Sequence, residues 1–311
     1  MFMYIRMVFL MAIGLYASRV ILQTLGISDY GLYNVVGGVV AMFGFLNSTL
    51  STSTQRFLNV EIGKGNSDSV KRVFSNALYL HLLLAIIVFF LAETVGLWFL
   101  LNKLVIPEGR ETAALWVYQF SIVAVCIQIF QLPFMSSIIA HERMGIYAYV
   151  SIYEGLAKLG ILFVLQLVDY DKLFLYGALI LAVQLSVAVI YNIYSRKNFE
   201  EASFRISKDK GLFREMLGFS GWNIFGNLAS VCNSQGLNIV LNLFFGTAIN
   251  AARGIAFQVH GLVTQLVNNF QLAVKPQVVK YYAAGQHEEM TDLVFNSAKY
   301  SAYLMMVVNI P

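Results

Sequence analysis

Polar side chains recur at helical spacing within residues 250–276, a stretch apolar enough to cross a membrane. Seven positions three or four residues apart form the pattern: Arg253, Phe257, His260, Thr264, Asn268, Gln271 and Lys275. Such spacing places side chains on one face of a helix. Polar groups inside a membrane span are costly and normally face a bundle interior or a wet cavity. The pattern therefore predicts a helix face that lines a cavity.

Polar positions of the same kind occur in other apolar stretches. Residues 213–245 contain Asn223, Asn227, Ser230, Ser234, Asn238 and Asn242, residues 33–57 contain Asn47, Ser48, Ser51 and Gln55, and residues 2–25 contain Arg19 and Gln23. From these faces we select a candidate substrate-binding set: Arg19, Gln55, Asn223, Asn227, Arg253, His260, Asn268 and Lys275.

Each of these residues also has a purely structural interpretation. Ser, Thr and Asn commonly hydrogen-bond one membrane helix to another, with a contribution of about 0.6–2 kcal/mol each. Arg19 and Arg253 each lie within two turns of a predicted outer helix end, where a long cationic side chain can reach the interface. His260 fits a packing role as well as a cavity role.

One acid and one base share a turn within residues 146–168. Glu154 precedes Lys158 by four residues, which is the favourable order for an ion pair on a helix. We expect a structural ion pair, and the alternative is a titrating or ion-binding group that couples transport to a gradient. Glu93, near a predicted outer helix end, is expected to be solvated.

The composition places most of the chain in a membrane. Hydrophobic residues make up 58% of the 311 residues, charged residues 12%, and the mean hydropathy is +0.68. A soluble domain averages about 45–50% apolar and about 25% charged residues. No basic tract with interleaved aromatics indicates nucleic-acid binding. Cys126 and Cys232 lie inside apolar stretches and are expected to be core residues.

Nothing in the sequence indicates an enzyme, a cofactor or a metal site. No HExxH, GxSxG or phosphate-binding loop motif occurs. The predicted outer loops are about 13 residues or shorter, too short for a catalytic lobe. Residues 216–274 contain no Asp or Glu, so an acid–base pair is not expected there.

Apolar runs of about 20 residues are candidate membrane helices. They predict an all-α polytopic membrane protein with about nine spans: 2–25, 33–57, 73–100, 113–139, 146–168, 173–195, 213–245, 248–274 and 291–311. Fourteen Lys and Arg residues fall at the N-terminus or after even-numbered spans, and three fall after odd-numbered spans. This asymmetry predicts a cytoplasmic N-terminus.

The chain also resembles itself at an offset of 220 residues. The offset aligns the first and second spans with the seventh and eighth, Gly65 with Gly285, and Asn76 with Asn296. Parallel repeats of six helices are therefore expected, with an N-terminal half at 1–196, a cytoplasmic linker at 197–212 and the start of a second half at 213–311. Two six-helix bundles would need twelve helices, so we expect the sequence to be incomplete at its C-terminus.

Specific motifs resemble the polysaccharide biosynthesis flippases of the O-antigen type, within the multidrug/oligosaccharidyl-lipid/polysaccharide exporter superfamily. The resemblance is carried by SRVILQTLGISDYGLYNVVGGVVAMFGFLNSTLSTSTQRFL from Ser18, FGTAINAARGIAFQV at 245–259, KPQ at 275–277 and YAAG at 282–285. It implies two six-helix lobes around a cavity that opens alternately to each side. It also implies a bacterial inner-membrane protein that turns undecaprenyl-pyrophosphate-linked oligosaccharide between leaflets, with membrane lipids and a coupling H⁺ or Na⁺ as further partners.

The resemblance also assigns roles. Related flippases of lipid-linked peptidoglycan precursors hold pyrophosphate with arginines on the first and eighth helices, and Arg19 and Arg253 stand at comparable places. Two alternatives remain: a multidrug or cation antiporter of the same superfamily, and a membrane glycan polymerase or ligase. The first and second spans contain no acid, which argues against the antiporter, and the short loops argue against the polymerase.

Overall fold

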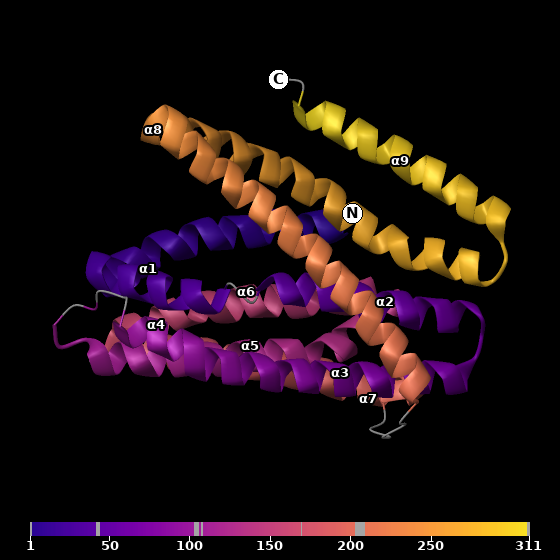
Figure 1. Cartoon of the computed structure of the whole chain (residues 1–311), viewed down its shortest axis with the longest axis horizontal. Helices are drawn as coiled ribbons and strands as arrows, with labels where there is room; N and C mark the ends of the chain where they lie inside the picture. The colour runs from indigo at the N-terminus through magenta and orange to yellow at the C-terminus, as the bar shows by residue number, and fades with distance from the viewer. Residues whose placement is uncertain are drawn as a thin grey trace.

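The structure is a computed structural model that describes residues 2–41, 44–102, 106, 108–168, 170–202 and 209–309; for residues 230–263, and for some other residues of α1, α2, α8 and α9, it describes the helix but not the side chains. The regular elements of this described part are all helical (Figure 1). They are α1 (Phe2–Ala41), α2 (Gly44–Gly63), α3 (Ser67–Leu91), the π-helical turn η1 (Ala92–Gly96), α4 (Leu97–Asn102), α5 (Glu111–Ala140), α6 (Met144–Leu167), α7 (Lys172–Asn198), the 3₁₀ turn η2 (Glu200–Ala202), α8 (Lys210–Ala283) and α9 (His287–Asn309).

Four helical stretches of the described part are long and apolar enough to cross a membrane: Ser67–Asn102, Glu111–Ala140, Met144–Leu167 and Lys172–Asn198. They coincide with four predicted spans to within a few residues, except that the first begins six residues early. The all-α prediction is confirmed. The other predicted spans fall within α1, α2, α8 and α9, which are helical as well.

The chain bends at Gly26 where the sequence predicts a loop. Residues 26–32, expected to connect two spans, belong to α1, and only Gly26 departs from helical geometry, with φ 79° and ψ 169°. A positive φ suits glycine because it lacks a Cβ atom. A single glycine therefore turns the chain, and the helix resumes at once.

Helix α8 folds back on itself. A straight helix of its 74 residues would be about 110 Å long. Yet Ser220 bonds to Ser53 of α2, and Lys280 lies against Gly63 of the same 20-residue helix. Both ends of α8 therefore lie beside α2, and Figure 1 shows α8 as two arms. These arms correspond to the predicted spans 213–245 and 248–274.

The predicted repeat is visible in two helix–helix turns. Gly65 and Gly285, 220 residues apart, have φ angles of 71° and 75°. The amide of Gly65 donates to the carbonyl of Ile62 at 3.0 Å, and the amide of Gly285 donates to that of Tyr282 at 3.1 Å. The α2–α3 and α8–α9 connections therefore share one backbone design at the predicted offset.

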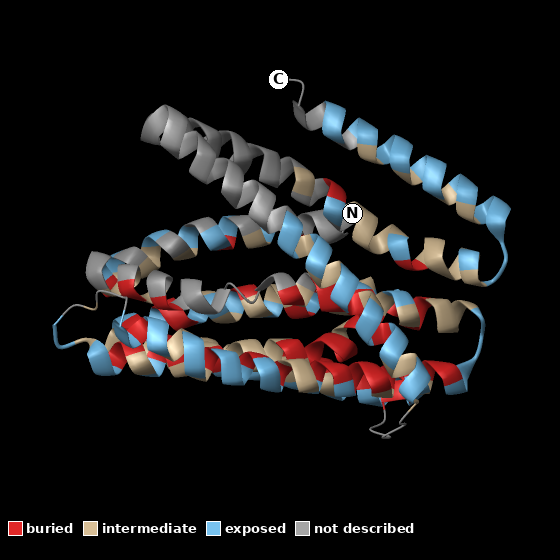
Figure 2. Cartoon of the chain, in the orientation of Figure 1, coloured by how far each residue is buried: buried red, intermediate tan, exposed pale blue. Residues whose placement is uncertain are grey.

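Most of the buried side chains that the structure describes lie in the first half of the chain. Side chains of α2, α3, α5 and α7 form its largest cluster, which includes Leu58, Phe74, Phe134 and Tyr191. Figure 2 shows buried residues concentrated in this bundle, whereas α9 is mostly exposed. Helices α1 to α7 thus form a packed unit against which the two arms of α8 are placed.

Candidate functional site

The outer face of α1 carries Arg19. Exposed positions on this helix recur every three or four residues: Phe9, Ala12, Tyr16, Arg19, Gln23 and Gly26. The opposite face packs on α6, where Gly155 allows a close approach of Leu10 and Ile13. Because α6 packs on that face, Arg19 lies on the exposed side of α1.

The first arm of α8 uses its predicted binding residues for hydrogen bonds between and within helices. Asn227 donates to the hydroxyl of Thr49 in α2 at 2.5 Å. Asn223 donates to the carbonyl of Phe219 in its own helix at 2.8 Å. Gln55 of α2 likewise donates to Ser51 one turn earlier at 2.7 Å. Asn227 therefore shows the alternative role, a hydrogen bond from one helix to another.

The second arm of α8 presents two of the predicted residues to its surroundings. Asn268 and Lys275 are exposed and lie seven residues apart, so they share a face of the helix. The side chains of Arg253 and His260 lie outside the described residues. Of the candidate set, the structure joins Asn227 to α2, leaves Arg19, Asn268 and Lys275 exposed, and shows no contact among these three.

The predicted ion pair on α6 forms. Nζ of Lys158 lies 2.6 Å from Oε1 of Glu154, and the two side chains retain 45% and 31% of their exposure. The structure also contains a chain of two hydrogen bonds that the sequence did not predict. Asn47 of α2 donates to Gln128 of α5, and Gln128 donates to Gln184 of α7, each at 3.2 Å. Gln128 and Gln184 are 56 residues apart in the sequence and meet because α5 packs on α7.

Three turns meet at one end of the bundle, which we call the Arg110 end. Arg110, just before α5, bonds through Nε to Oδ1 of Asp29 at 2.8 Å and through Nη1 to Oδ2 of Asp171 at 2.7 Å; its Nη2 also bonds to Asp29. Asp171 in addition caps α7 by accepting from the amide of Leu173. The cluster was missed because its members are 61 and 81 residues apart, and the same turns offer other ionisable residues, such as Glu108, Glu111 and Lys172.

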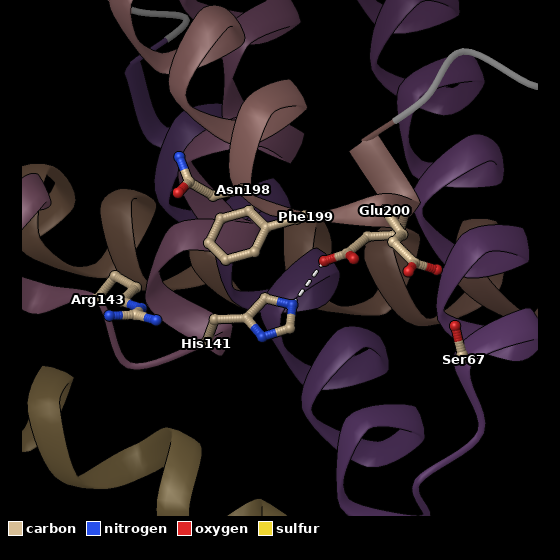
Figure 3. A pocket seen from close by; sticks show the side chains of 7 residues that line it. Ser67, His141, Arg143, Asn198, Phe199 and Glu200 are labelled. Carbon is tan, nitrogen blue, oxygen red and sulfur yellow. Dashed lines mark hydrogen bonds and ion pairs between the residues drawn. The ribbon is translucent and has the colours of Figure 1, made fainter.

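The opposite end, which we call the His141 end, holds a hollow of about 380 Å³ beside the α5–α6 turn. Figure 3 shows the His141 ring directed at a carboxylate of the η2 turn. His141 donates from Nε2 to Glu201 at 2.6 Å, Ser137 donates to the same oxygen at 2.8 Å, and Phe199 stacks on the imidazole at 4.3 Å. These contacts hold the start of the connection between α7 and α8 against the end of α5.

Hydrogen bonding decides the charge of Glu201 in this hollow. Burial alone would raise the pKa of its carboxyl group, but hydrogen bonds from His141, the backbone and Ser137 outweigh burial and hold the pKa below the ordinary 4.5. Glu201 is 6% exposed and charged at neutral pH, and two donors share its charge.

The two repeats touch at this same end. Glu142 has a positive φ of 59° and pairs with Lys280 of α8 at 2.6 Å. A Cβ atom added to Gly63 would lie 2.8 Å from the carbonyl oxygen of Lys280 and 2.9 Å from the Cβ atom of Ala283. The ends of α2 and α8 are therefore in close contact at the His141 end.

Similarity to solved structures is high in shape and low in sequence. The outward-facing conformation of a multidrug resistance MATE family transporter of the MOP superfamily matches with a TM-score of 0.79 at 13% identity, over 99% of this chain and 68% of that chain. A MOP superfamily transporter from Pyrococcus furiosus, described as having a reversed binding-pocket polarity that suggests a different function, matches with a TM-score of 0.77 at 15% identity, over 99% and 68%. This chain has the fold of those transporters.

No protein-family model matches the sequence, and no curated protein does. A MATE structure in the straight conformation also matches, with a TM-score of 0.77 at 14% identity, over 99% of this chain and 69% of that chain. At such identities the similarity establishes the architecture. The solved structures are longer than this chain, and the ligand has to be inferred from the side chains that this sequence places on the shared scaffold.

Proposed function

We propose that the chain is a membrane transporter that moves a lipid-linked oligosaccharide across the bacterial inner membrane by alternating access. The observation that carries the proposal is the charge of the exposed polar positions. The exposed members of the candidate set are two cations and one amide, Arg19, Lys275 and Asn268. Cationic and amide donors suit an anionic, sugar-bearing ligand.

The pyrophosphate is the part of such a ligand that an arginine recognises best. A guanidinium group binds phosphate oxygens in a bidentate manner. Arg19 on α1 and Arg253 on α8 belong to different repeats, so one ligand held by both would join the two halves, 1–196 and 213–311, across the linker 197–212. Asn268 and His260 supply further donors for sugar hydroxyls. Glu154 and Lys158, which form an ion pair on α6, are kept as an alternative coupling pair for H⁺ or Na⁺.

The topology follows from the distribution of cations. A cytoplasmic N-terminus places the His141 end at the cytoplasm, with Lys64, Lys71 and Arg196 near the anionic lipids of the inner leaflet. Contact between the repeats at the His141 end would then close the cytoplasmic side, so that a central cavity opens to the periplasm. Alternating access requires this contact to break in the other state.

Transport of the oligosaccharide lipid by reconstituted full-length protein tests the proposal. Arg19→Ala and Arg253→Ala should each slow flipping by about tenfold or more, because a hydrogen bond to a charged group contributes about 1.5–3 kcal/mol. Arg214→Ala, an exposed cation at the start of α8, serves as the matched control. Unchanged flipping in both variants refutes the arginine clamp.

A second candidate function is supported by a specific observation, the fold match to a multidrug resistance MATE transporter. A cationic drug would need an acid on the cavity face. Two results together would favour the antiporter over the flippase. Efflux of a cationic dye would persist in Arg19→Ala and Arg253→Ala, and the unmodified protein would flip no oligosaccharide.

A further inference from the structure

The hollow at the His141 end lies where four described membrane-crossing stretches begin or end. Ser67 is the first residue of the stretch Ser67–Asn102, and Asn198 is the last residue of α7. His141 directly follows α5, and Arg143 directly precedes α6. Helix ends therefore bound this hollow of about 380 Å³, and the transport function assigns it no ligand.

Helix length sets the depth of the hollow in a bilayer. The 30 residues of α5 and the 27 residues of α7 form helices of about 45 Å and about 40 Å. A bilayer together with its headgroup regions is about 40–45 Å thick. Because each helix spans nearly that whole thickness, the residues at its end lie at the level of the lipid headgroups.

One side of the hollow carries a cation without an acid partner. Arg143 is exposed and forms no ion pair with any residue that the structure describes. The adjacent acid, Glu142, pairs instead with Lys280 of α8. A guanidinium group binds phosphate oxygens in a bidentate manner. Arg143 therefore indicates a ligand that carries a phosphate group, which every phospholipid headgroup does.

The other side of the hollow carries a carboxylate. Figure 3 shows Glu200 and Arg143 on opposite sides of the stacked rings of His141 and Phe199. Glu200 accepts from Lys71 through Oε2 at 2.9 Å and retains 81% of its exposure. A carboxylate offers about four lone-pair sites on its two oxygens. Glu200 can therefore also accept a hydrogen bond from an ammonium group of a ligand.

Separated charges of opposite sign suit a zwitterionic headgroup better than an anionic one. Glu200 and Glu201 both line the hollow and would repel a ligand with a net negative charge. Ethanolamine phosphate carries its ammonium group two carbon atoms from its phosphate, so it presents one charge to each side. Beside the hollow, α7 exposes the apolar side chains Leu185, Val189 and Ile193 four residues apart, a surface that acyl chains can cover.

We propose that the hollow at the His141 end binds the headgroup of a zwitterionic aminophospholipid, with the phosphate on Arg143 and the ammonium group on Glu200. The site is distinct from the proposed substrate cavity, and it binds a lipid of the bilayer that is not transported. Because Arg143 follows Glu142, which pairs with Lys280, the bound lipid lies beside the contact between the two repeats.

Native mass spectrometry of the full-length protein in detergent tests the site by titration with phosphatidylethanolamine, phosphatidylcholine or phosphatidylglycerol of identical acyl chains. Phosphatidylethanolamine should bind about tenfold more tightly than phosphatidylcholine, whose trimethylammonium group has no N–H to donate. Arg143→Ala should weaken binding of phosphatidylethanolamine about tenfold, because a charged hydrogen-bond donor is lost. Arg196→Ala, an exposed cation at the same end and outside the lining of the hollow, is the matched control and should bind as the unmodified protein does.

A second pair of variants tests the ammonium contact. Glu200→Gln removes the negative charge and should reduce the preference for phosphatidylethanolamine over phosphatidylcholine. Asp68→Asn, which changes an exposed acid beside Ser67, should keep that preference.

Three results would overturn the proposal. Equal binding of phosphatidylethanolamine by Arg143→Ala and Arg196→Ala would show that the lipid does not use the hollow. Tighter binding of phosphatidylglycerol would contradict a zwitterionic ligand, and displacement of the lipid by inorganic phosphate would show that the hollow takes a free phosphate. No transport is measured, so the lipid site stands or fails separately from the flippase proposal.

Discussion

Glu201 keeps a buried charge at the His141 end because two donors at the end of α5 share it. Ser137 lies in the last turn of the helix and His141 directly after it, and both donate to one carboxylate oxygen. Glu200, its neighbour, is instead exposed and pairs with Lys71 of α3. The two acids thus fasten the α7–α8 connection to two helices, one through a buried contact and one through an exposed contact.

Acid should weaken the buried contact selectively. The folded state holds the pKa of Glu201 below 4.5, so its stabilisation is fully present above that value and is lost as pH falls through the folded-state pKa. Glu201→Gln should lower the free energy of unfolding at neutral pH by about 1–3 kcal/mol. Thermal unfolding in detergent measures this loss, which should shrink as the pH falls below 4.5. Glu200→Gln is the control, and an equal loss in both variants contradicts the assignment.

Local pairs among these residues could be predicted from the sequence, and distant pairs could not. Glu154 and Lys158 are one helical turn apart, so helix geometry alone brings them together. Asn227 bonds to Thr49, which is 178 residues away, and predicting this pair requires knowledge of how α8 packs on α2. The π-helical turn at Ala92–Gly96 likewise gives no sign in the sequence pattern.

At the scale of elements, the extents of the helices follow from composition, whereas their connections depend on single residues. Apolar runs predicted the four described membrane helices because a span needs about 20 apolar residues. The bend at Gly26 was expected to be a loop because Gly26, Ser28 and Asp29 favour turns. Packing of Leu25 and Leu32 on neighbouring helices instead keeps the chain helical on both sides of the bend.

Arg110 is expected to stabilise the arrangement of three turns at once. Arg110→Ala leaves Asp29 and Asp171 without their cation, and we expect the free energy of unfolding to fall by about 1–3 kcal/mol. Arg110→Lys should give an intermediate loss, because an ammonium group lacks the fork that reaches two carboxylates. Lys172→Ala, at the same end, is the control in the same thermal unfolding assay. A loss no larger than that of the control would show that the cluster contributes nothing.

At the scale of the whole molecule, the repeat determines where the two halves meet. The hydrogen bonds of the α2–α3 turn recur 220 residues later in the α8–α9 turn, as with Gly65 and Gly285. Under the same offset Gly63 corresponds to Ala283, and these two residues contact each other. The closed end is therefore a contact between equivalent places in the two repeats, reinforced by Glu142 and Lys280.

Enlarging Gly63 should open this end. An added methyl group would lie 2.8 Å from a backbone oxygen of α8, which cannot rotate away, and overpacking costs about 1–3 kcal/mol. Gly63→Ala should therefore speed labelling of Ala283→Cys by a membrane-impermeant maleimide about tenfold. Gly145→Ala, where an added Cβ meets nothing within 4 Å, is the matched control. Equal labelling rates in the two variants would refute a closed contact at Gly63.

The pairing of Gly63 with Ala283 has a consequence for how equivalent positions in two halves of one chain can differ. In a symmetric dimer of one half, the residue at this place would face its own copy, and any methyl group added by mutation would be added twice. A single chain lacks this symmetry, so a mutation changes only one of the two positions. The present pair, one glycine and one alanine, places a single methyl group where a dimer could hold none or two.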